Sequence, residues 1–190
     1  MLPKEQIIKK LKKEIDEERF QHTMRVAEVS KKLAREYNVN IEKAEISALL
    51  HDCAKYKDKS ILLKKAYEFG IILDNVFKDN TNIIHGLLGA EIAKSKYNVL
   101  DKDILNAIRY HTIGRKNMTI LEKIIFISDY IEPDRNFEGI KKVRDLAEKD
   151  IDKAIILAID KTIKYLIYKG ETIHPNTIKT RNQLLMQIKK

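Results

Sequence analysis

The adjacent residues His51 and Asp52 end an apolar run that includes Ala48, Leu49 and Leu50. They offer an imidazole nitrogen and a carboxylate oxygen at one point of the chain, a combination that suits iron, manganese, cobalt or zinc. A histidine at an ordinary solvated helix end also interacts favourably with the helix dipole. The pair therefore predicts a metal site only if other segments supply further ligands.

Four other residues are candidates for those ligands. The chain contains only five histidines, and each lies on a separate segment. An aspartate ends the largely apolar segment 124–128, where a carboxylate needs a cation or hydrogen bonds to offset its desolvation. Each candidate alone could be a helix cap or a packed polar residue, but their joint occurrence favours a shared metal site. The candidates are His22, His85, His111 and Asp129.

The elements that position these residues are expected to be helices. Apolar residues recur at helical rather than alternating spacing, and only three prolines and six glycines interrupt the chain. We therefore expect an all-α fold. Gly86 and Gly89 lie within one expected helix and indicate close packing against another backbone. Five residues are expected to cap helices: Asn40, Ser60, Asn82, Thr119 and Asn176. The other expected helices cover about residues 4–15, 17–37, 101–111, 139–149 and 151–169.

Length and composition limit the class of protein. The 190 residues fit one domain spanning 1–190. A formal net charge of +9 favours polyanionic partners, which include nucleic acid, an acidic membrane face and a phosphate-rich substrate. Cys53 is the single cysteine, so no intrachain disulfide can form and a reducing compartment is expected. No segment resembles a signal peptide or a membrane span, so we expect a soluble, cytoplasmic protein without a membrane partner.

The chain resembles the HD-domain phosphohydrolases, in which a histidine, a His-Asp pair and a later aspartate bind metal. Within that family it is most similar to the bacterial YqeK-like symmetrical bis(5'-nucleosyl)-tetraphosphatases. Besides the histidines, the resemblance is carried by residues 112–115, 121–135 and 169–175, and it spans about residues 19–182. Cys53 and Glu138 depart from the family pattern, but neither is an expected ligand. The resemblance implies a single HD-type helical bundle.

The resemblance also implies a metal centre. The first metal, for which iron is preferred and manganese or cobalt are alternatives, is expected on His22, His51, Asp52 and Asp129. Asp52 could bridge to a second metal held with His85 and His111. Alternatively, these two histidines could hold phosphate oxygens directly when only one metal is bound.

Catalytic and substrate-binding roles follow from the same resemblance. The expected catalytic residues are Asp52, Lys55, His85 and His111. Arg19 lies one helical turn before His22, and Lys55 lies three residues after Asp52, so both could reach phosphates. The loop around His174 is expected to form a wall of a nucleoside pocket. The expected substrate-binding residues are Arg19, His22, His85, His111, Thr112, Arg135, Thr172, Ile173, His174 and Arg181.

The expected activity is hydrolysis of dinucleoside polyphosphates by a metal-activated water, with symmetric cleavage of diadenosine tetraphosphate to two ADP. One alternative is another HD-domain enzyme that acts on mononucleotides or cyclic dinucleotides. A second is a basic helical module that binds RNA or a ribosomal surface and keeps a structural metal. The positive charges are scattered along the helices and the sequence shows no aromatic stacking platform, so a nucleic-acid partner is disfavoured. We also consider a homodimer.

Overall fold

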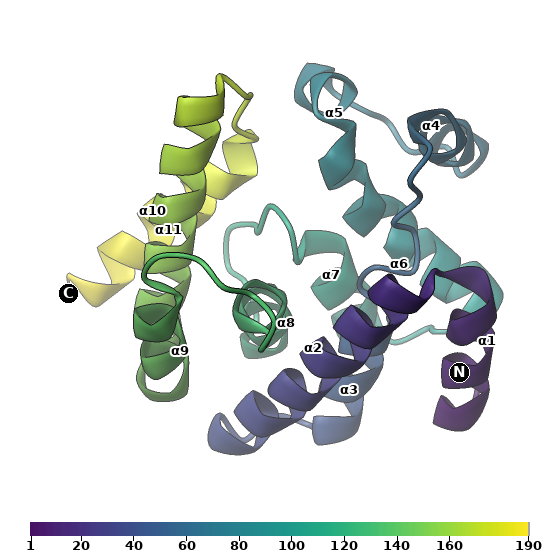
Figure 1. Ribbon diagram of the computed structural model, residues 1–190, viewed down its shortest axis with the longest axis horizontal. Coiled ribbons are helices and arrows are strands. Elements are labelled where there is room, and N and C mark those ends of the chain that lie inside the picture. The colour runs from purple at the N-terminus through teal and green to yellow at the C-terminus, as the bar shows by residue number, and fades with distance from the viewer. Residues whose placement is uncertain (190) are drawn as a thin grey trace.

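The computed structural model describes residues 1–189, and within them all regular structure is helical. The expected all-α fold is therefore confirmed. Figure 1 places α9, α10 and α11 together on one side of α8, and the earlier helices on the other side. The helices are α1 (Lys4–Glu14), α2 (Glu17–Glu36), α3 (Ile41–Leu50), α4 (Lys59–Glu68), α5 (Asn75–Asp79), the 3-10 helix η1 (Thr81–Ile83), α6 (Ile84–Tyr97), α7 (Lys102–Tyr110), α8 (Ile120–Ile131), α9 (Ile140–Lys149), α10 (Ile151–Lys169) and α11 (Pro175–Ile188).

Two of the expected helix caps are confirmed. The Asn40 side chain accepts a hydrogen bond from the Lys43 N–H at 2.9 Å, and the Thr119 hydroxyl accepts one from the Glu122 N–H at 3.3 Å. Both bonds satisfy a backbone donor that has no partner within the helix. The starts of α3 and α8 were thus predictable from local sequence.

The other three expected caps are wrong. Asp58 caps α4 by accepting from the Ser60 N–H, and Asn80 caps η1 by accepting from the Asn82 N–H. His174 caps α11 by accepting from the Asn176 N–H at 3.1 Å. In each case the predicted residue donates the capped N–H, and the acceptor lies two residues earlier. Pro175 fits the first turn of α11 because that turn needs no donor from it.

The glycines of α6 allow the close packing that the sequence predicted. A Cβ atom added at Gly86 would lie 2.8 Å from the backbone oxygen of Arg109 in α7. At Gly89 it would lie 3.3 Å from a methyl carbon of Ile108 and 3.4 Å from the backbone oxygen of His51. The absence of side chains here lets the start of α6 approach the ends of α3 and α7, which all carry candidate site residues.

The main helix contacts join these elements around one core. α2 packs against α3 and α8, α3 packs against α7 and α8, and α6 packs against α7. Cys53 is buried with its sulfur 3.6 Å from the backbone oxygen of Gly89, and burial raises the pKa of its thiol. It therefore behaves as a small buried apolar residue. Among residues 1–189, no helix is long and apolar enough to cross a membrane.

Candidate metal centre and active site

The candidate ligands come from five helices and meet at one place. His22 lies inside α2, His51 ends α3, His85 lies in the first turn of α6, His111 ends α7, and Asp129 lies near the end of α8. All four histidines are buried, whereas Asp129 is partly buried. Apolar packing of these helices therefore brings together donors that are far apart in the sequence.

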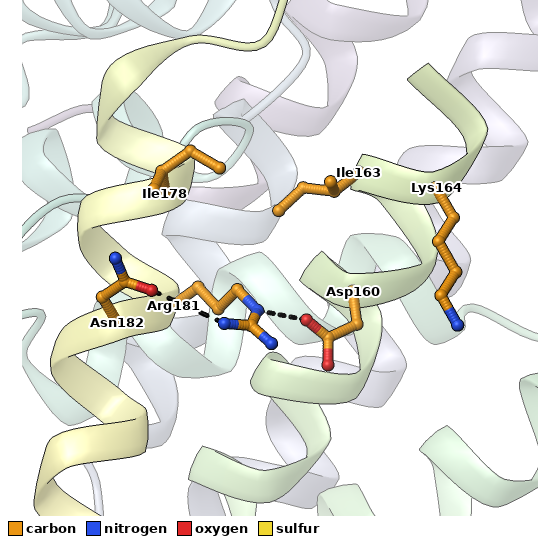
Figure 2. A pocket seen from close by; sticks show the side chains of 6 residues that line it. All are labelled: Asp160, Ile163, Lys164, Ile178, Arg181 and Asn182. Carbon is orange, nitrogen blue, oxygen red and sulfur yellow. Dashed lines mark hydrogen bonds and ion pairs between the residues drawn. The ribbon is translucent and has the colours of Figure 1, made fainter. Parts of the chain in front are cut away.

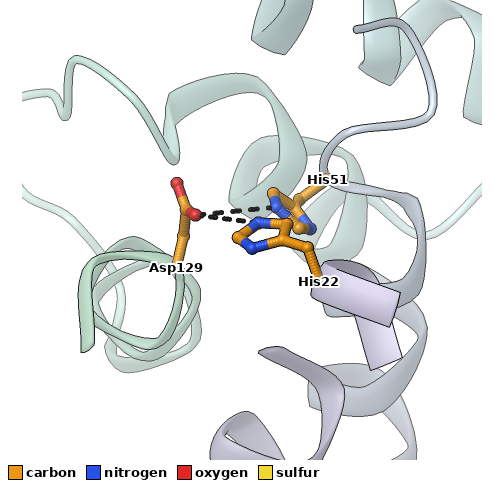
Figure 3. A group of neighbouring side chains, drawn as sticks. All are labelled: His22, His51 and Asp129. Carbon is orange, nitrogen blue, oxygen red and sulfur yellow. Dashed lines mark ion pairs between the residues drawn. The ribbon is translucent and has the colours of Figure 1, made fainter. Parts of the chain in front are cut away.

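One side of the cluster joins His22, His51 and Asp129, as Figure 3 shows. His22 Nε2 lies 3.1 Å from Asp129 Oδ1, and His51 Nε2 lies 3.9 Å from the same oxygen. Burial raises the pKa of Asp129, but the contacts with His22 and His51 lower it more, so the pKa lies well below its usual range. Asp129 is therefore an ionised oxygen donor that faces two imidazoles.

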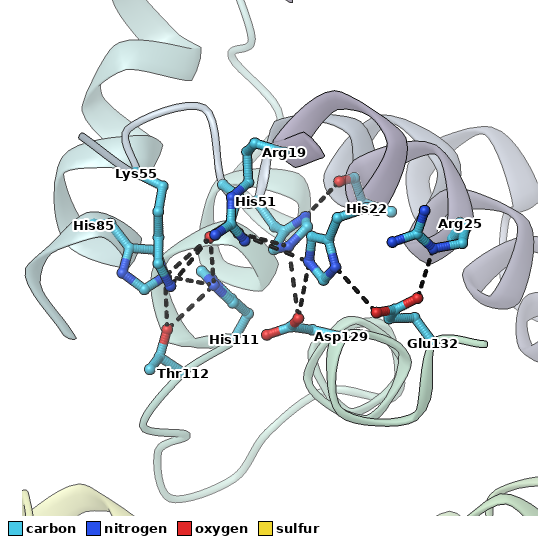
Figure 4. Close-up of polar contacts among 12 residues, drawn as sticks. Arg19, His22, Arg25, His51, Lys55, His85, His111, Thr112, Asp129 and Glu132 are labelled. Atoms are coloured by element: carbon cyan, nitrogen blue, oxygen red, sulfur yellow. Dashed lines mark hydrogen bonds and ion pairs between the residues drawn. The ribbon is translucent and has the colours of Figure 1, made fainter. Parts of the chain in front are cut away.

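Asp52 lies between two pairs of histidines. Figure 4 shows these histidines, with His22 and His51 in one pair and His85 and His111 in the other. Its Oδ2 faces His51 Nε2 at 3.5 Å and His22 Nε2 at 3.8 Å. Its Oδ1 faces His85 Nε2 at 3.1 Å and His111 Nε2 at 3.8 Å. Each oxygen of Asp52 thus faces one pair of imidazoles.

In three of these histidines the second ring nitrogen, Nδ1, faces a backbone carbonyl oxygen. The Nδ1 atoms lie 2.6 Å from the Ala48 oxygen for His51, 2.5 Å from the Asn82 oxygen for His85, and 2.7 Å from the Ile108 oxygen for His111. A carbonyl oxygen can only accept, so Nδ1 carries the proton in each ring. The Nε2 atoms are left as acceptors directed into the cluster, which is the tautomer that binds metals.

The protonation states also suit a metal site. Burial lowers the pKa of His51 to about 4, against the opposing charges of Asp52 and Asp129. Burial and the Lys55 charge lower the pKa of His85 to about 4. Burial raises the pKa of Asp52, but His51 and Lys55 lower it more, so the net shift is downward. Near neutral pH these residues are neutral imidazoles and a carboxylate, the forms that ligate metal.

Several of these atoms have no hydrogen-bond partner. Within the described residues, His22 Nε2, His51 Nε2 and Asp52 Oδ1 are buried and unpaired. In addition, the acceptor atoms Nε2 of His85 and His111 lie only 3.0 Å apart, so they need a shared cation or proton. Unpaired buried polar atoms destabilise a fold. Buried nitrogen and oxygen donors of this kind fit a divalent transition metal.

Three cations surround the carboxylates. Arg19 Nη1 donates to Asp52 Oδ2 at 2.6 Å, and Lys55 Nζ lies 3.8 Å from Asp52 Oδ1. Arg135 Nη2 donates to Asp129 Oδ1 at 3.2 Å. These side chains rim a pocket of about 460 Å³ above the cluster, which also reaches His22. His22 is the candidate ligand that lines this pocket, and four cations among the lining residues face three carboxylates: Arg19, Arg25, Lys55 and Arg135 against Glu18, Glu132 and Asp134.

This geometry agrees with a comparison of the sequence with known families, in which the HD domain matches residues 19–134. The chain belongs to the HD domain family. The expected HD-type fold and family are thus confirmed. In this HD domain the histidine and aspartate cluster indicates a divalent metal site.

Individual relatives extend the likeness over nearly the whole chain. A protein of Halalkalibacterium halodurans named "Bis(5'-nucleosyl)-tetraphosphatase, symmetrical" is 41% identical over 179 residues, covering 94% of this chain and 95% of its own length. A Bacillus subtilis protein of the same name is 37% identical, covering 96% and 97%. The crystal structure of a "predicted HD superfamily hydrolase involved in NAD metabolism" from Clostridium acetobutylicum has a TM-score of 0.95 at 40% identity, covering 98% of this chain and 99% of that one.

Glu132 also contacts the candidate site, although no role for it was predicted from the sequence. It is 3% exposed, and its Oε1 lies 3.4 Å from His22 Nδ1. Its Oε2 accepts from Arg25 Nε at 2.8 Å and from the Asp134 N–H at 3.0 Å. Glu132 thus holds the fourth histidine as backbone carbonyls hold the other three. The available signal was a glutamate directly after the apolar end of α8.

Arg144 of α9 was also missed. Its guanidinium donates to the backbone oxygens of the last residue of α8 and of three residues that follow it, at 2.8 to 3.1 Å. These are Ile131, Glu132, Pro133 and Arg135. The segment that supplies Glu132 and Arg135 to the HD site is therefore fixed by an arginine outside it. No spacing rule in the sequence indicated this contact.

Thr112 lies beside His85 and His111, and the 170–175 loop packs against α5. The Thr112 hydroxyl is 3.3 Å from His85 Nε2 and 3.2 Å from His111 Nε2. The His174 ring packs on Phe77 with 4.6 Å between ring centroids, and Thr172 donates to Asp79 at 2.9 Å. The loop therefore contacts α5 and the start of α11, and Ile173 is partly buried within it.

Arg181 is not brought into the cluster. It forms an ion pair with Asp160 between α10 and α11, in a separate pocket of about 500 Å³ (Figure 2). None of the candidate metal ligands lines that pocket. The expected role of Arg181 in holding phosphate or ribose oxygens therefore has no support from its position, because it lies in a pocket that no candidate metal ligand lines.

Proposed function

We propose that this chain is a divalent-metal-dependent hydrolase that splits diadenosine tetraphosphate symmetrically into two ADP. The observation that carries the proposal is the buried cluster of four imidazoles and two carboxylates beneath a pocket rimmed by Arg19, Lys55 and Arg135. The donors suit a metal, and the rim suits a polyphosphate. The relatives of matching length that carry this activity in their names supply the choice of substrate and cleavage position.

His22, His51, Asp52 and Asp129 are the proposed ligands of the first metal, with iron as the preferred ion and manganese or cobalt as alternatives. His85 and His111, together with Asp52, would hold a second ion. This assignment rests on the position of Asp52 between the two histidine pairs. When bound, a divalent metal supplies Lewis acidity and a water molecule that is nucleophilic near neutral pH.

The residues of the chain position the substrate and balance its charge. Arg19 and Lys55 lie beside Asp52, so they contact the phosphoryl group that is attacked and stabilise the charge that develops on its oxygens. Thr112 donates to a phosphate oxygen from the side of His85. Water adds to a central phosphorus, the central P–O bond breaks, and the leaving ADP takes the bridging oxygen. The Thr172 to His174 segment lines a nucleoside site.

Metal analysis and product identification test the proposal together. Elemental analysis of protein purified without chelator is compared for the wild type, His51→Ala and His85→Ala. We expect His51→Ala to lose metal and activity together, whereas His85→Ala keeps at least one metal equivalent and loses activity. Glu148→Gln, in an exposed ion pair with Lys32, is the matched control and leaves both unchanged.

Two results contradict the proposal. Chromatography that finds AMP and ATP as the main products of diadenosine tetraphosphate contradicts symmetric cleavage. Full metal content in His51→Ala contradicts the ligand assignment, because that ring nitrogen is directed at both carboxylates.

A further inference from the structure

A further pocket, of about 690 Å³, shares Arg135 with the pocket beside the metal centre and extends to α10. It is bounded by the end of α8, by residues 135–138 and by α10. In Figure 1 the segment after α8 is the green loop that runs from this helix towards α9 and α10. The lining residues are Tyr130, Arg135, Phe137, Glu138, Lys161, Thr162, Lys164 and Tyr165.

Aromatic rings form much of the apolar wall of this pocket. Tyr130 and Phe137 pack edge to face, with ring centroids 5.3 Å apart and an interplanar angle of 79°. Phe137 is 38% exposed and Tyr165 is 57% exposed, so neither ring is used fully by the core. The sequence indicated no aromatic stacking platform. The three rings are separated in sequence and come together only because α10 packs against α8.

The pocket is connected to the metal centre by one side chain. Arg135 lines both this pocket and the pocket above the cluster, and its Nη2 donates to the candidate ligand Asp129 at 3.2 Å. Tyr130 directly follows Asp129 in α8. A polyphosphate bound at the cluster can therefore extend past the Arg135 guanidinium into the aromatic pocket.

The charge and anchoring of the pocket suit a nucleotide. Arg135, Lys161 and Lys164 outnumber the single carboxylate of Glu138 among the lining residues. Lys161 Nζ also donates to the backbone oxygen of Glu138 at 2.9 Å, so it anchors the loop that carries Phe137. A flat base can stack on the rings while its phosphates stay among the cations.

We propose that this aromatic pocket binds the base and ribose of one nucleoside of the dinucleotide substrate. The other nucleoside lies on the opposite side of the cluster, at the loop that carries His174. The inference rests on the proposed function, because a substrate with two nucleosides joined by four phosphates needs two base sites that flank the site of cleavage. Tyr165 is then a specificity-determining residue that acts on binding rather than on the chemical step.

The test compares Tyr165→Ala with Tyr168→Ala in the metal-loaded protein. Tyr168 is the matched control because it lies three residues further along α10, is 85% exposed and does not line the pocket. For diadenosine tetraphosphate we expect Tyr165→Ala to raise KM by about tenfold, in the range of one lost base-stacking contact. The value of kcat should change little. Tyr168→Ala should leave both constants unchanged, and Tyr165→Phe should restore the wild-type KM.

A binding measurement separates this inference from the proposed function. The chain contains no tryptophan, so Tyr165→Trp and Tyr168→Trp each introduce a single fluorescent reporter. We expect ADP to quench the tryptophan at position 165 by stacking and not the one at 168, and we expect inorganic tripolyphosphate to quench neither.

The outcomes are distinguishable. A wild-type protein that does not release ADP from diadenosine tetraphosphate refutes the proposed function, while selective quenching at position 165 still decides whether the pocket binds a nucleoside. If the wild type is active and Tyr165→Ala has an unchanged KM, the second base lies elsewhere. Equal quenching at both positions, or none at either, also overturns the inference.

Discussion

Replacement of Glu132 by glutamine tests how far the metal centre depends on a residue that is not a candidate ligand. Glu132 faces the one histidine of the cluster whose Nδ1 is not held by a backbone oxygen. Burial raises its pKa, but hydrogen bonds from Arg25 and from the Asp134 N–H lower it more, so the side chain is a carboxylate near neutral pH. A carboxylate on the far nitrogen of a ligating histidine fixes the ring and raises its basicity.

The magnitude follows from what the substitution removes. Glutamine keeps the shape and can still accept from Asp134, but it lacks the charge that acts on His22 and Arg25. Loss of such a partner typically costs about 10–100-fold in metal affinity or activity. Glu132→Ala also removes the acceptors of the Asp134 N–H and Arg25. It should therefore further lower the free energy of unfolding by about 1–3 kcal/mol, less where Arg25 regains water.

The assay is a competition between the protein and a chelator of known affinity, followed by thermal unfolding monitored by circular dichroism. We expect Glu132→Gln to weaken metal binding with a nearly unchanged melting temperature, and Glu132→Ala to lower both. Glu148→Gln serves as the control, since both partners of that ion pair are exposed. Unchanged metal affinity in Glu132→Gln would refute the reasoning, because the carboxylate would then have no influence on His22.

Three further predictions concern the framework. Arg144→Met removes the donor to four carbonyls and should raise KM and destabilise the fold by about 1–3 kcal/mol, as kinetics and thermal unfolding would measure. Gly86→Ala places a Cβ 2.8 Å from the Arg109 oxygen and should cost about 1–3 kcal/mol in denaturant unfolding. Chelator-treated protein should lose stability as the pH falls from 7.5 to 5. The pKa of His51 and of His85 is about 4 when folded and 6.5 when unfolded, so the unfolded chain binds the protons first. Over this pH range the free energy of unfolding should fall by about 2 kcal/mol per histidine. A melting temperature that rises on acidification would contradict this prediction.

The cluster could be predicted from residue types because histidine is rare in this chain and a carboxylate is unusual after an apolar run. Part of its internal geometry is also local. His51, His85 and His111 each contact the backbone oxygen three residues earlier, which a helix end or a first turn places beside Nδ1. Such contacts follow from the position of a histidine in a helix and need no tertiary information.

The remaining contacts depend on tertiary packing. Glu132 and His22 are 110 positions apart. The expected metal site already brings α2 near Asp129, but no local pattern indicates that Glu132 would face the other nitrogen of His22. The expected phosphate-binding or ribose-binding role of Arg181 lacks support for the same reason. The sequence did not show that Arg181 would pair with Asp160 of α10. Long-range pairs of charged side chains were thus the part of the site that local reasoning missed.

Several buried atoms of the cluster lack the hydrogen-bond partners that most buried polar atoms of a fold have. Serine and threonine hydroxyls without a partner can rotate towards one, but a carboxylate oxygen and an imidazole nitrogen fixed through its other nitrogen cannot. Asp52 Oδ1 and His51 Nε2 are such fixed atoms, and each lost hydrogen bond costs about 1–3 kcal/mol. Among the described residues outside the cluster, the comparable unpaired atoms are His174 Nε2 and Asp152 Oδ1, and the latter lies 2.6 Å from Lys123 Nζ. The cluster therefore gathers three of these five fixed atoms at one place: His22 Nε2, His51 Nε2 and Asp52 Oδ1. Such concentration is typical of a functional site rather than of imperfect folding.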